Sequence, residues 1–119
     1  MNKYKIGMEG EDIACKYLEK EGYSIIERNY RGKKGEIDII ARDGNVIVFI
    51  EVKSWKTIPV SEAAFSISSM KKRRIINSAE QYIFENRKQV LNSDIRFDFV
   101  FVDAVKNSIS HNKNIIMES

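Results

Sequence analysis

The chain has 119 residues, of which 43% are hydrophobic and 31% charged, with 1 proline and 6 glycines. This length is enough for one domain over residues 1–119, and the composition excludes an intrinsically disordered protein. No run approaches the roughly 18 apolar residues of a membrane span, and residues 1–11 lack the apolar segment of a signal peptide, so we expect a cytoplasmic protein without a membrane partner. The single cysteine and single histidine exclude a zinc cluster but leave an oxygen-liganded metal open.

The net charge of +3 is modest and by itself says little about nucleic acid. The positions of the basic residues say more, because they gather in two short stretches while the carboxylates are spread more thinly. The two stretches contain Arg28, Arg31, Lys33 and Lys34, and then Lys71, Lys72, Arg73 and Arg74.

Apolar residues at helical spacing predict a helix over residues 5–21, with Gly22 as its C-terminal stop. Residues 23–30 place isoleucines between polar neighbours and predict a first strand. The strand is expected to end in a basic turn at residues 31–35, which contains two glycines.

The next part of the chain predicts a β-hairpin. Residues 36–42 and 45–54 are β-rich runs separated by Asp43-Gly44, a dipeptide that favours two-residue turns. Successive strand side chains point to opposite faces, so one face of the hairpin is expected to be entirely apolar. That face carries Ile37, Ile39, Ala41, Val46, Val48, Ile50 and Val52.

The opposite face of the hairpin has an apolar middle and a charged end. A turn made of Asp43-Gly44 places Asp38 opposite Phe49, with Glu51 as its diagonal neighbour. Lys53 then lies two residues beyond Glu51 on the same face. A three-residue turn would separate these side chains onto different faces.

The second half of the chain predicts a loop over residues 55–60, a helix over residues 69–87 and a strand over residues 96–104. Residues 114–117 are expected to add a short edge strand, within a peripheral extension from about residue 105. The predicted order is α-β-β-β-α-β, an α/β fold with a mixed central sheet flanked by helices.

The charged end of the hairpin suggests a metal site. Two carboxylates about 5 to 8 Å apart repel each other unless a cation or a proton lies between them. Asp38 and Glu51 suit Mg²⁺ or Mn²⁺, which take one or two carboxylates together with waters and phosphate oxygens. Lys53 can orient an attacking water or stabilise the negative charge that builds on phosphorus. The alternative interpretation is a solvated strand end in which Lys53 neutralises the two carboxylates.

Glu11 is a further candidate for this site. It precedes Ala14 by three residues and Leu18 by seven, which places it on the helix face that packs against the sheet. A lone carboxylate buried there would be costly, and a site shared with Asp38 and Glu51 resolves that cost. An ordinary first-turn glutamate, favoured by the helix dipole, remains the alternative.

The basic residues of the second stretch lie at the start of the predicted helix, where positive charge opposes the helix dipole. A bound phosphate relieves this conflict, although a solvated basic turn explains it equally well. Trp55 can stack on a base or pack on the core. The candidate nucleic-acid-binding residues are Arg31, Lys33, Lys34, Lys71, Lys72 and Arg74.

An ordered series of short motifs carries a family resemblance. The motifs are Gly10-Glu11 with Ala14, Tyr17-Leu18, Gly22-Tyr23, Asn29-Tyr30-Arg31, Gly35-Glu36-Ile37-Asp38, Phe49-Ile50-Glu51-Val52-Lys53 and Arg96-Phe97-Asp98. Over residues 5–103 the chain resembles the YraN-like family of small bacterial proteins, which belongs to the restriction-endonuclease-like superfamily and is similar to archaeal Holliday-junction resolvases.

The resemblance implies a PD-(D/E)xK nuclease core. In that core Asp38 and Glu51 would bind Mg²⁺, Lys53 would be the catalytic lysine and Glu11 the acidic residue of the first helix. The expected activity is hydrolysis of DNA phosphodiesters, in branched or damaged DNA, by a homodimer. The alternative is a noncatalytic nucleic-acid-binding protein that retains the nuclease fold.

The sequence departs from this family at two positions. Trp55 stands where related sequences usually have an arginine two residues after the lysine. Of the Gly-x-Pro usual in the following loop, only Pro59 is present. Both departures concern residues expected to position the phosphate.

Overall fold

The computed structural model describes residues 3–55, 69–103, 106 and 108–114. Its elements, in chain order, are α1 (Lys3–Lys20), β1 (Ser24–Arg31), β2 (Glu36–Asp43), β3 (Val46–Trp55), α3 (Ser69–Glu85), β4 (Asp94–Asp103) and β5 (Ser108–Asn112). This order confirms the predicted α-β-β-β-α-β arrangement and is compatible with a restriction-endonuclease-like core.

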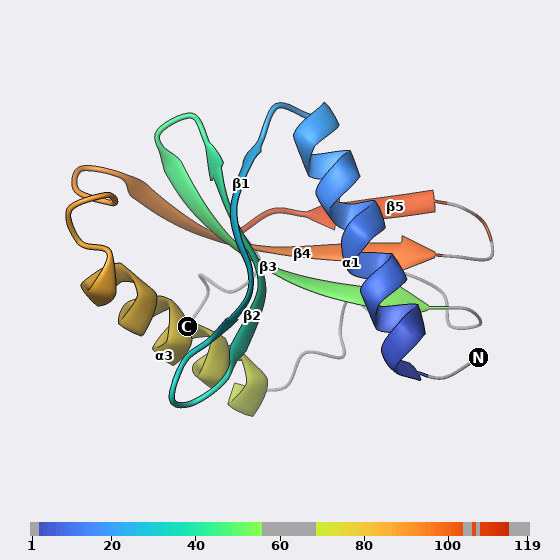
Figure 1. Cartoon of the computed structure of the whole chain (residues 1–119), viewed down its shortest axis with the longest axis horizontal. Coiled ribbons are helices and arrows are strands. Elements are labelled where there is room, and N and C mark those ends of the chain that lie inside the picture. The colour runs from blue at the N-terminus through green and yellow to red at the C-terminus, as the bar shows by residue number, and fades with distance from the viewer. Residues whose placement is uncertain (1–2, 56–68, 104–105, 107, 115–119) are drawn as a thin grey trace.

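The five strands form one mixed sheet in the order β1-β2-β3-β4-β5. Strands β1, β2 and β3 form an antiparallel meander, and β5 pairs antiparallel with β4. Strands β3 and β4 are parallel, so the connection between them must cross over, and α3 lies in that crossover. Figure 1 shows α1 and α3 on opposite sides of the sheet.

Each helix covers its own hydrophobic core, because β2 and β3 alternate their side chains between the two faces. On the α1 side, Ala14 and Leu18 pack with Ile39, Ile50 and their neighbours. The core on the α3 side contains Ile40, Ile47 and Phe49 from the hairpin, and Ile75, Ala79 and Tyr82 from the helix. A sheet buried on both faces explains why both strands of the hairpin are so apolar.

The turn of the hairpin differs from the predicted one. Asp43 pairs with Val46, so the two turn residues are Gly44 and Asn45 rather than Asp43 and Gly44. Gly44 has a φ of 60°, which a glycine adopts without the strain that a Cβ would cause. The physical reason for the shift is therefore that glycine occupies the first turn position.

The new turn moves the register by two residues. Ile40, not Asp38, pairs with Phe49. Because side chains alternate with a period of two, a shift of two residues leaves the side chains of the regular ladder on their predicted faces. The regular ladder ends at the pair Ile39 and Ile50, just before Asp38 and Glu51.

The end of β2 next to Asp38 is irregular. Beyond the last regular pair, the Asp38 Oδ2 atom accepts a hydrogen bond of 2.8 Å from the backbone N–H of Val52. The expectation for Ile37 was wrong at this point, because its side chain joins the core on the α3 side instead of the α1 side. The Asp38 carboxylate, instead of a backbone carbonyl of β2, accepts the hydrogen bond from β3 here. The strict alternation of side chains between the two faces of the sheet is lost at this point.

The remaining differences concern the ends of elements. Helix α3 stops at Glu85, two residues earlier than predicted. The edge strand is β5 at Ser108–Asn112, whereas Asn114 lies in a bend with a φ of 60°. The predicted loop from residue 56, including Pro59, and residues 115–117 lie outside the described residues. Neither described helix is long and apolar enough to cross a membrane.

Candidate functional site

Asp38 and Glu51 lie together in one cavity of about 390 Å³ between the sheet and α3. Glu51 comes from the interior strand β3, and its side chain is only 8% exposed. Asp38 is half-buried at the irregular end of β2. The cavity is completed by Gly35, Glu36, Lys71, Arg74 and Ile75.

The two carboxyl groups are close enough to disturb each other. Burial raises the pKa of Asp38 to about 8, and the charge of Glu51 and a hydrogen bond to its carboxylate act in the same direction. The hydrogen bond from the Val52 N–H only partly opposes this. A proton or a cation therefore stabilises the pair, as the spacing of the two carboxylates predicted.

Two lysines accompany the carboxylates. Lys71 Nζ, from the start of α3, forms an ion pair with Glu51 Oε2. The pKa of Lys53 is lowered, first by burial and then by the charge of Lys71. The sequence placed Lys71 only on a nucleic-acid-binding surface, but the structure brings it to the carboxylate pair. In the sequence, Lys71 is visible only as part of a basic run at the start of a helix, and such a run does not show that one lysine pairs with Glu51.

Glu11 lies close to this site but has its own contacts. Its Oε1 atom is 3.7 Å from Arg28 Nη2, which also forms an ion pair of 2.8 Å with Asp12. Burial raises the pKa of Glu11, while a hydrogen bond with Asn29 lowers it. The Oε1 atom is buried without a hydrogen-bond partner, and the Glu11 charge still raises the pKa of Asp38.

The carboxylates and imidazoles of the described residues nowhere gather in a group of three that could hold a metal ion. The site thus offers a divalent ion two close carboxylates, from Asp38 and Glu51. Coordination by Glu11 stays a prediction.

The two predicted basic stretches lie next to each other. The turn between β1 and β2 packs so tightly on α3 that a Cβ added to Gly35 would lie 3.2 Å from the Cβ of Arg74. In the same turn, the backbone N–H of Lys33 donates a hydrogen bond of 2.8 Å to Gln81 Oε1. In Figure 1 this turn runs beside α3. Arg31, Lys33 and Lys34 are therefore close to the helix that carries Lys71, Lys72 and Arg74.

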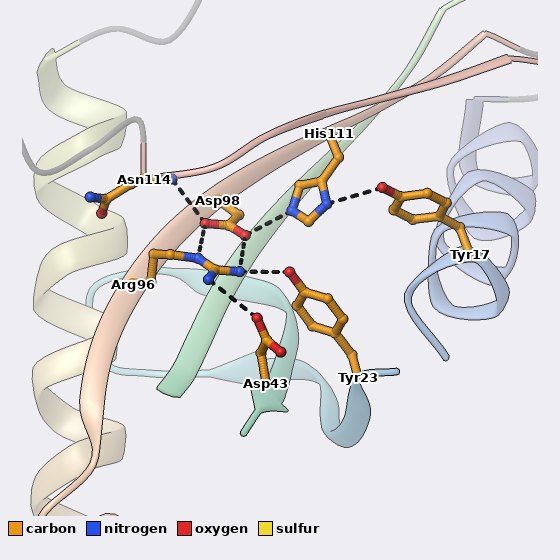
Figure 2. A network of polar contacts seen from close by, with 7 residues as sticks. All are labelled: Tyr17, Tyr23, Asp43, Arg96, Asp98, His111 and Asn114. Atoms are coloured by element: carbon orange, nitrogen blue, oxygen red, sulfur yellow. Dashed lines mark hydrogen bonds and ion pairs between the residues drawn. The ribbon is translucent and has the colours of Figure 1, made fainter. Parts of the chain in front are cut away.

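A second polar cluster surrounds Asp98, which is fully buried in β4 (Figure 2). Arg96 donates two hydrogen bonds of 2.9 Å to the Asp98 carboxylate. His111 Nε2 lies 2.7 Å from the same carboxylate, and the backbone N–H of Asn114 donates to it at 2.9 Å. None of these four residues lines the cavity. His111, the single histidine of the chain, therefore has a structural role in this cluster.

Comparison with known proteins identifies the family. Residues 10–102 match the model of a family described as "Uncharacterised protein family UPF0102". The chain belongs to this family. A UPF0102 protein of Brachyspira hyodysenteriae is 48% identical over 104 residues, which cover 86% of this chain and 85% of that protein. A UPF0102 protein of Clostridium perfringens is 40% identical over 121 residues, covering 100% of this chain and 98% of that protein. The resemblance to the YraN-like family is thereby confirmed.

Among solved structures, SfsA of Pyrococcus furiosus in complex with Ca²⁺ is similar at 17% identity and a TM-score of 0.38. The matched region covers 94% of this chain and 64% of that chain. The UPF0102 description assigns no activity, so function must be argued from the site itself.

Proposed function

We propose that this UPF0102 protein is a metal-dependent endonuclease that hydrolyses DNA phosphodiesters, with branched or damaged DNA as its substrate class. The observation that carries the proposal is the juxtaposition of the half-buried Asp38 and the buried Glu51 carboxylates with two lysines at one end of the sheet. The basic turn between β1 and β2 and the start of α3 lie beside this group, where a DNA backbone needs positive charge.

The donor atoms fit Mg²⁺ or Mn²⁺. Both ions prefer oxygen ligands, and Mg²⁺ commonly takes one or two protein carboxylates and completes its shell with waters and phosphate oxygens. Asp38 and Glu51 would hold the ion, and the Oε1 atom of Glu11, which has no hydrogen-bond partner, is a candidate for an outer contact. Once bound, such an ion polarises the phosphoryl group and lowers the pKa of a coordinated water.

The protein side chains would contribute positioning and charge. The pKa of Lys53 is lowered by burial and by the charge of Lys71, and its amine lies within electrostatic range of both carboxylates. At this place it orients the attacking water and stabilises the negative charge that develops on phosphorus. Arg31, Lys33, Lys34, Lys72 and Arg74 would hold neighbouring phosphates of the strand.

The second candidate is a noncatalytic DNA-binding protein that keeps the nuclease fold. It is favoured by the ion pair between Lys71 and Glu51, which already neutralises one carboxylate without a metal. For such a protein, Glu51→Ala leaves DNA affinity unchanged or improves it, and no metal supports cleavage.

Cleavage of end-labelled DNA tests the proposal. Four-way junction, flap, duplex and single-stranded substrates are incubated with the protein in Mg²⁺ and in Mn²⁺. Metal-dependent cutting is expected for at least one substrate, and Lys53→Ala is expected to lower its rate by about 100-fold or more, since it removes charge stabilisation of the transition state. Lys88→Ala, which removes an exposed lysine beyond α3, is the matched control and should cut normally. Equal cutting by Lys53→Ala, or no cutting at all, contradicts the proposal.

A further inference from the structure

The contact between Lys71 and Glu51 joins the crossover helix to the centre of the site. Glu51 is held in β3, which pairs with β4 from Val46 to Trp55, so its position is rigidly set by the sheet. Lys71 reaches it from α3, and its side chain is 36% exposed against 8% for Glu51. The ion pair is thus formed by a fixed, buried carboxylate and a longer, more exposed ammonium group.

The site needs this positive charge. A buried carboxylate without a counter-charge is strongly destabilising, and here a second carboxyl group, Asp38, lies beside it. Lys53 is held on the same strand as Glu51, two residues away, and its own charge is disfavoured by burial and by Lys71. Lys71 is the side chain for which a direct ion pair with Glu51 is observed.

We propose that Lys71 is a built-in counter-cation that competes with the divalent metal for Glu51, so that metal binding must displace the Lys71 ammonium from the carboxylate. This inference rests on the proposed function for the identity of the metal site, but not on DNA cleavage. It assigns to Lys71 a role in metal affinity in addition to the phosphate binding expected from the sequence.

The competition follows from the chemistry of the two cations. Mg²⁺ and Mn²⁺ require oxygen ligands, and an ammonium group has none to offer. Glu51 Oε2, already engaged by Lys71, is one of the few carboxylate oxygens in the cavity. A divalent ion at this position would also repel the Lys71 ammonium at short range and in partly buried surroundings, where charges are poorly screened.

Arg74 provides a matched control for this proposal. It lies one helical turn after Lys71 and lines the same cavity. Its Nη2 atom is 3.3 Å from Met70 Sδ, and it forms no ion pair with Glu51. Arg74→Gln therefore removes the same charge from the same cavity, but leaves the Lys71 contact in place.

The experiment is a calorimetric titration of Mn²⁺ into the metal-free 119-residue protein without DNA, for wild type, Lys71→Gln and Arg74→Gln. Lys71→Gln is expected to bind Mn²⁺ about tenfold more tightly than wild type, because the competing cation is gone. Arg74→Gln is expected to change the affinity by less than about threefold, the effect of a nearby charge that is not paired with Glu51. Binding detected only in Lys71→Gln would support the proposal equally.

Two results would overturn the inference. If Lys71→Gln binds Mn²⁺ no more tightly than Arg74→Gln does, the total positive charge around the cavity sets the Mn²⁺ affinity, and displacement of Lys71 from Glu51 does not. The proposed metal site would stand in that case. If none of the three proteins binds Mn²⁺, both the inference and the proposed function fail. If competition is observed but DNA is never cut, only the nuclease proposal fails.

Thermal unfolding supplies an independent readout that also reports folding. In EDTA, Lys71→Gln should melt below wild type, because Glu51 has lost its counter-charge. Added Mn²⁺ should raise the melting temperature of Lys71→Gln more than that of wild type. Should Lys71→Gln not fold, Lys71→Arg keeps the positive charge and is expected to retain the weaker, wild-type Mn²⁺ affinity. Tighter Mn²⁺ binding by Lys71→Arg would contradict the proposal.

Discussion

At the scale of single residues, two aspartates of the same sheet behave in opposite ways. The pKa of Asp38 is raised because it is buried beside another carboxylate, Glu51. For Asp98, burial acts in the same upward direction, but hydrogen bonds from His111, Arg96 and the chain at Asn114 outweigh it and lower the pKa. The neighbours, not the residue type, decide whether the carboxyl group is charged.

Asp98→Asn is predicted to lower the free energy of unfolding at pH 7 by about 3 to 5 kcal/mol, since it leaves the Arg96 guanidinium without its buried partner. A lowered folded-state pKa means that Asp98 contributes stability above its unfolded pKa of about 3.9 and loses it as the pH falls through the folded value. The difference between wild type and variant should therefore shrink below about pH 4. Urea unfolding at several pH values measures this difference in the free energy of unfolding. Asp94→Asn, at an exposed position, is the control. A difference that does not change with pH would contradict this assignment.

At the scale of elements, the packing of α1 on β3 depends on the absence of a side chain at Gly10. A Cβ at this position would lie 1.7 Å from Ser54 Oγ and 3.1 Å from the Ser54 Cβ. The helix and the strand therefore approach each other at the strand end that also carries Lys53 and Glu51. Glycine is unfavourable inside a helix, so the close approach outweighs helix propensity here.

Gly10→Ala is predicted to destabilise the protein by about 1 to 3 kcal/mol, although alanine favours the helix by about 1 kcal/mol. The cause is overlap with Ser54 Oγ, an atom that is buried without a hydrogen-bond partner. Adding Ser54→Ala should recover part of the loss, because it removes the overlapping atom and breaks no hydrogen bond. Denaturant unfolding of both single variants and the double variant tests this coupling. If the changes in the free energy of unfolding of the two single variants simply add up in the double variant, the overlap is not the cause.

At the scale of the whole molecule, the fold brings together charges that are distant in the sequence. The turn between β1 and β2 rests on α3, so its lysines lie close to the helix that carries the second basic stretch. The net charge of +3 is small, and this local concentration rather than the total charge is what a DNA backbone would meet.

Lys33→Glu and Lys72→Glu are each predicted to weaken binding of four-way junction DNA, and to reduce the slope of log affinity against log salt by about one for each phosphate that is no longer neutralised. Lys88→Glu, beyond the far end of α3, changes the net charge equally and should have a much smaller effect. Fluorescence anisotropy over a range of salt concentrations measures the slopes. Equal effects of all three changes would mean that binding follows net charge and not this surface.

The sequence alone determined the order of elements, the faces of the hairpin except at Ile37, and the grouping of Asp38, Glu51 and Lys53. These features depend on hydrophobic periodicity, and the alternation of strand side chains is unaffected by a two-residue shift in register. The tertiary structure decided the turn at Gly44 and the ion pair of Lys71 with Glu51. It also decided the burial of Asp98 with His111. The turn follows from the local freedom of glycine to adopt a positive φ. The ion pair and the burial of Asp98 depend on which distant elements pack together, and local sequence patterns do not encode that long-range choice.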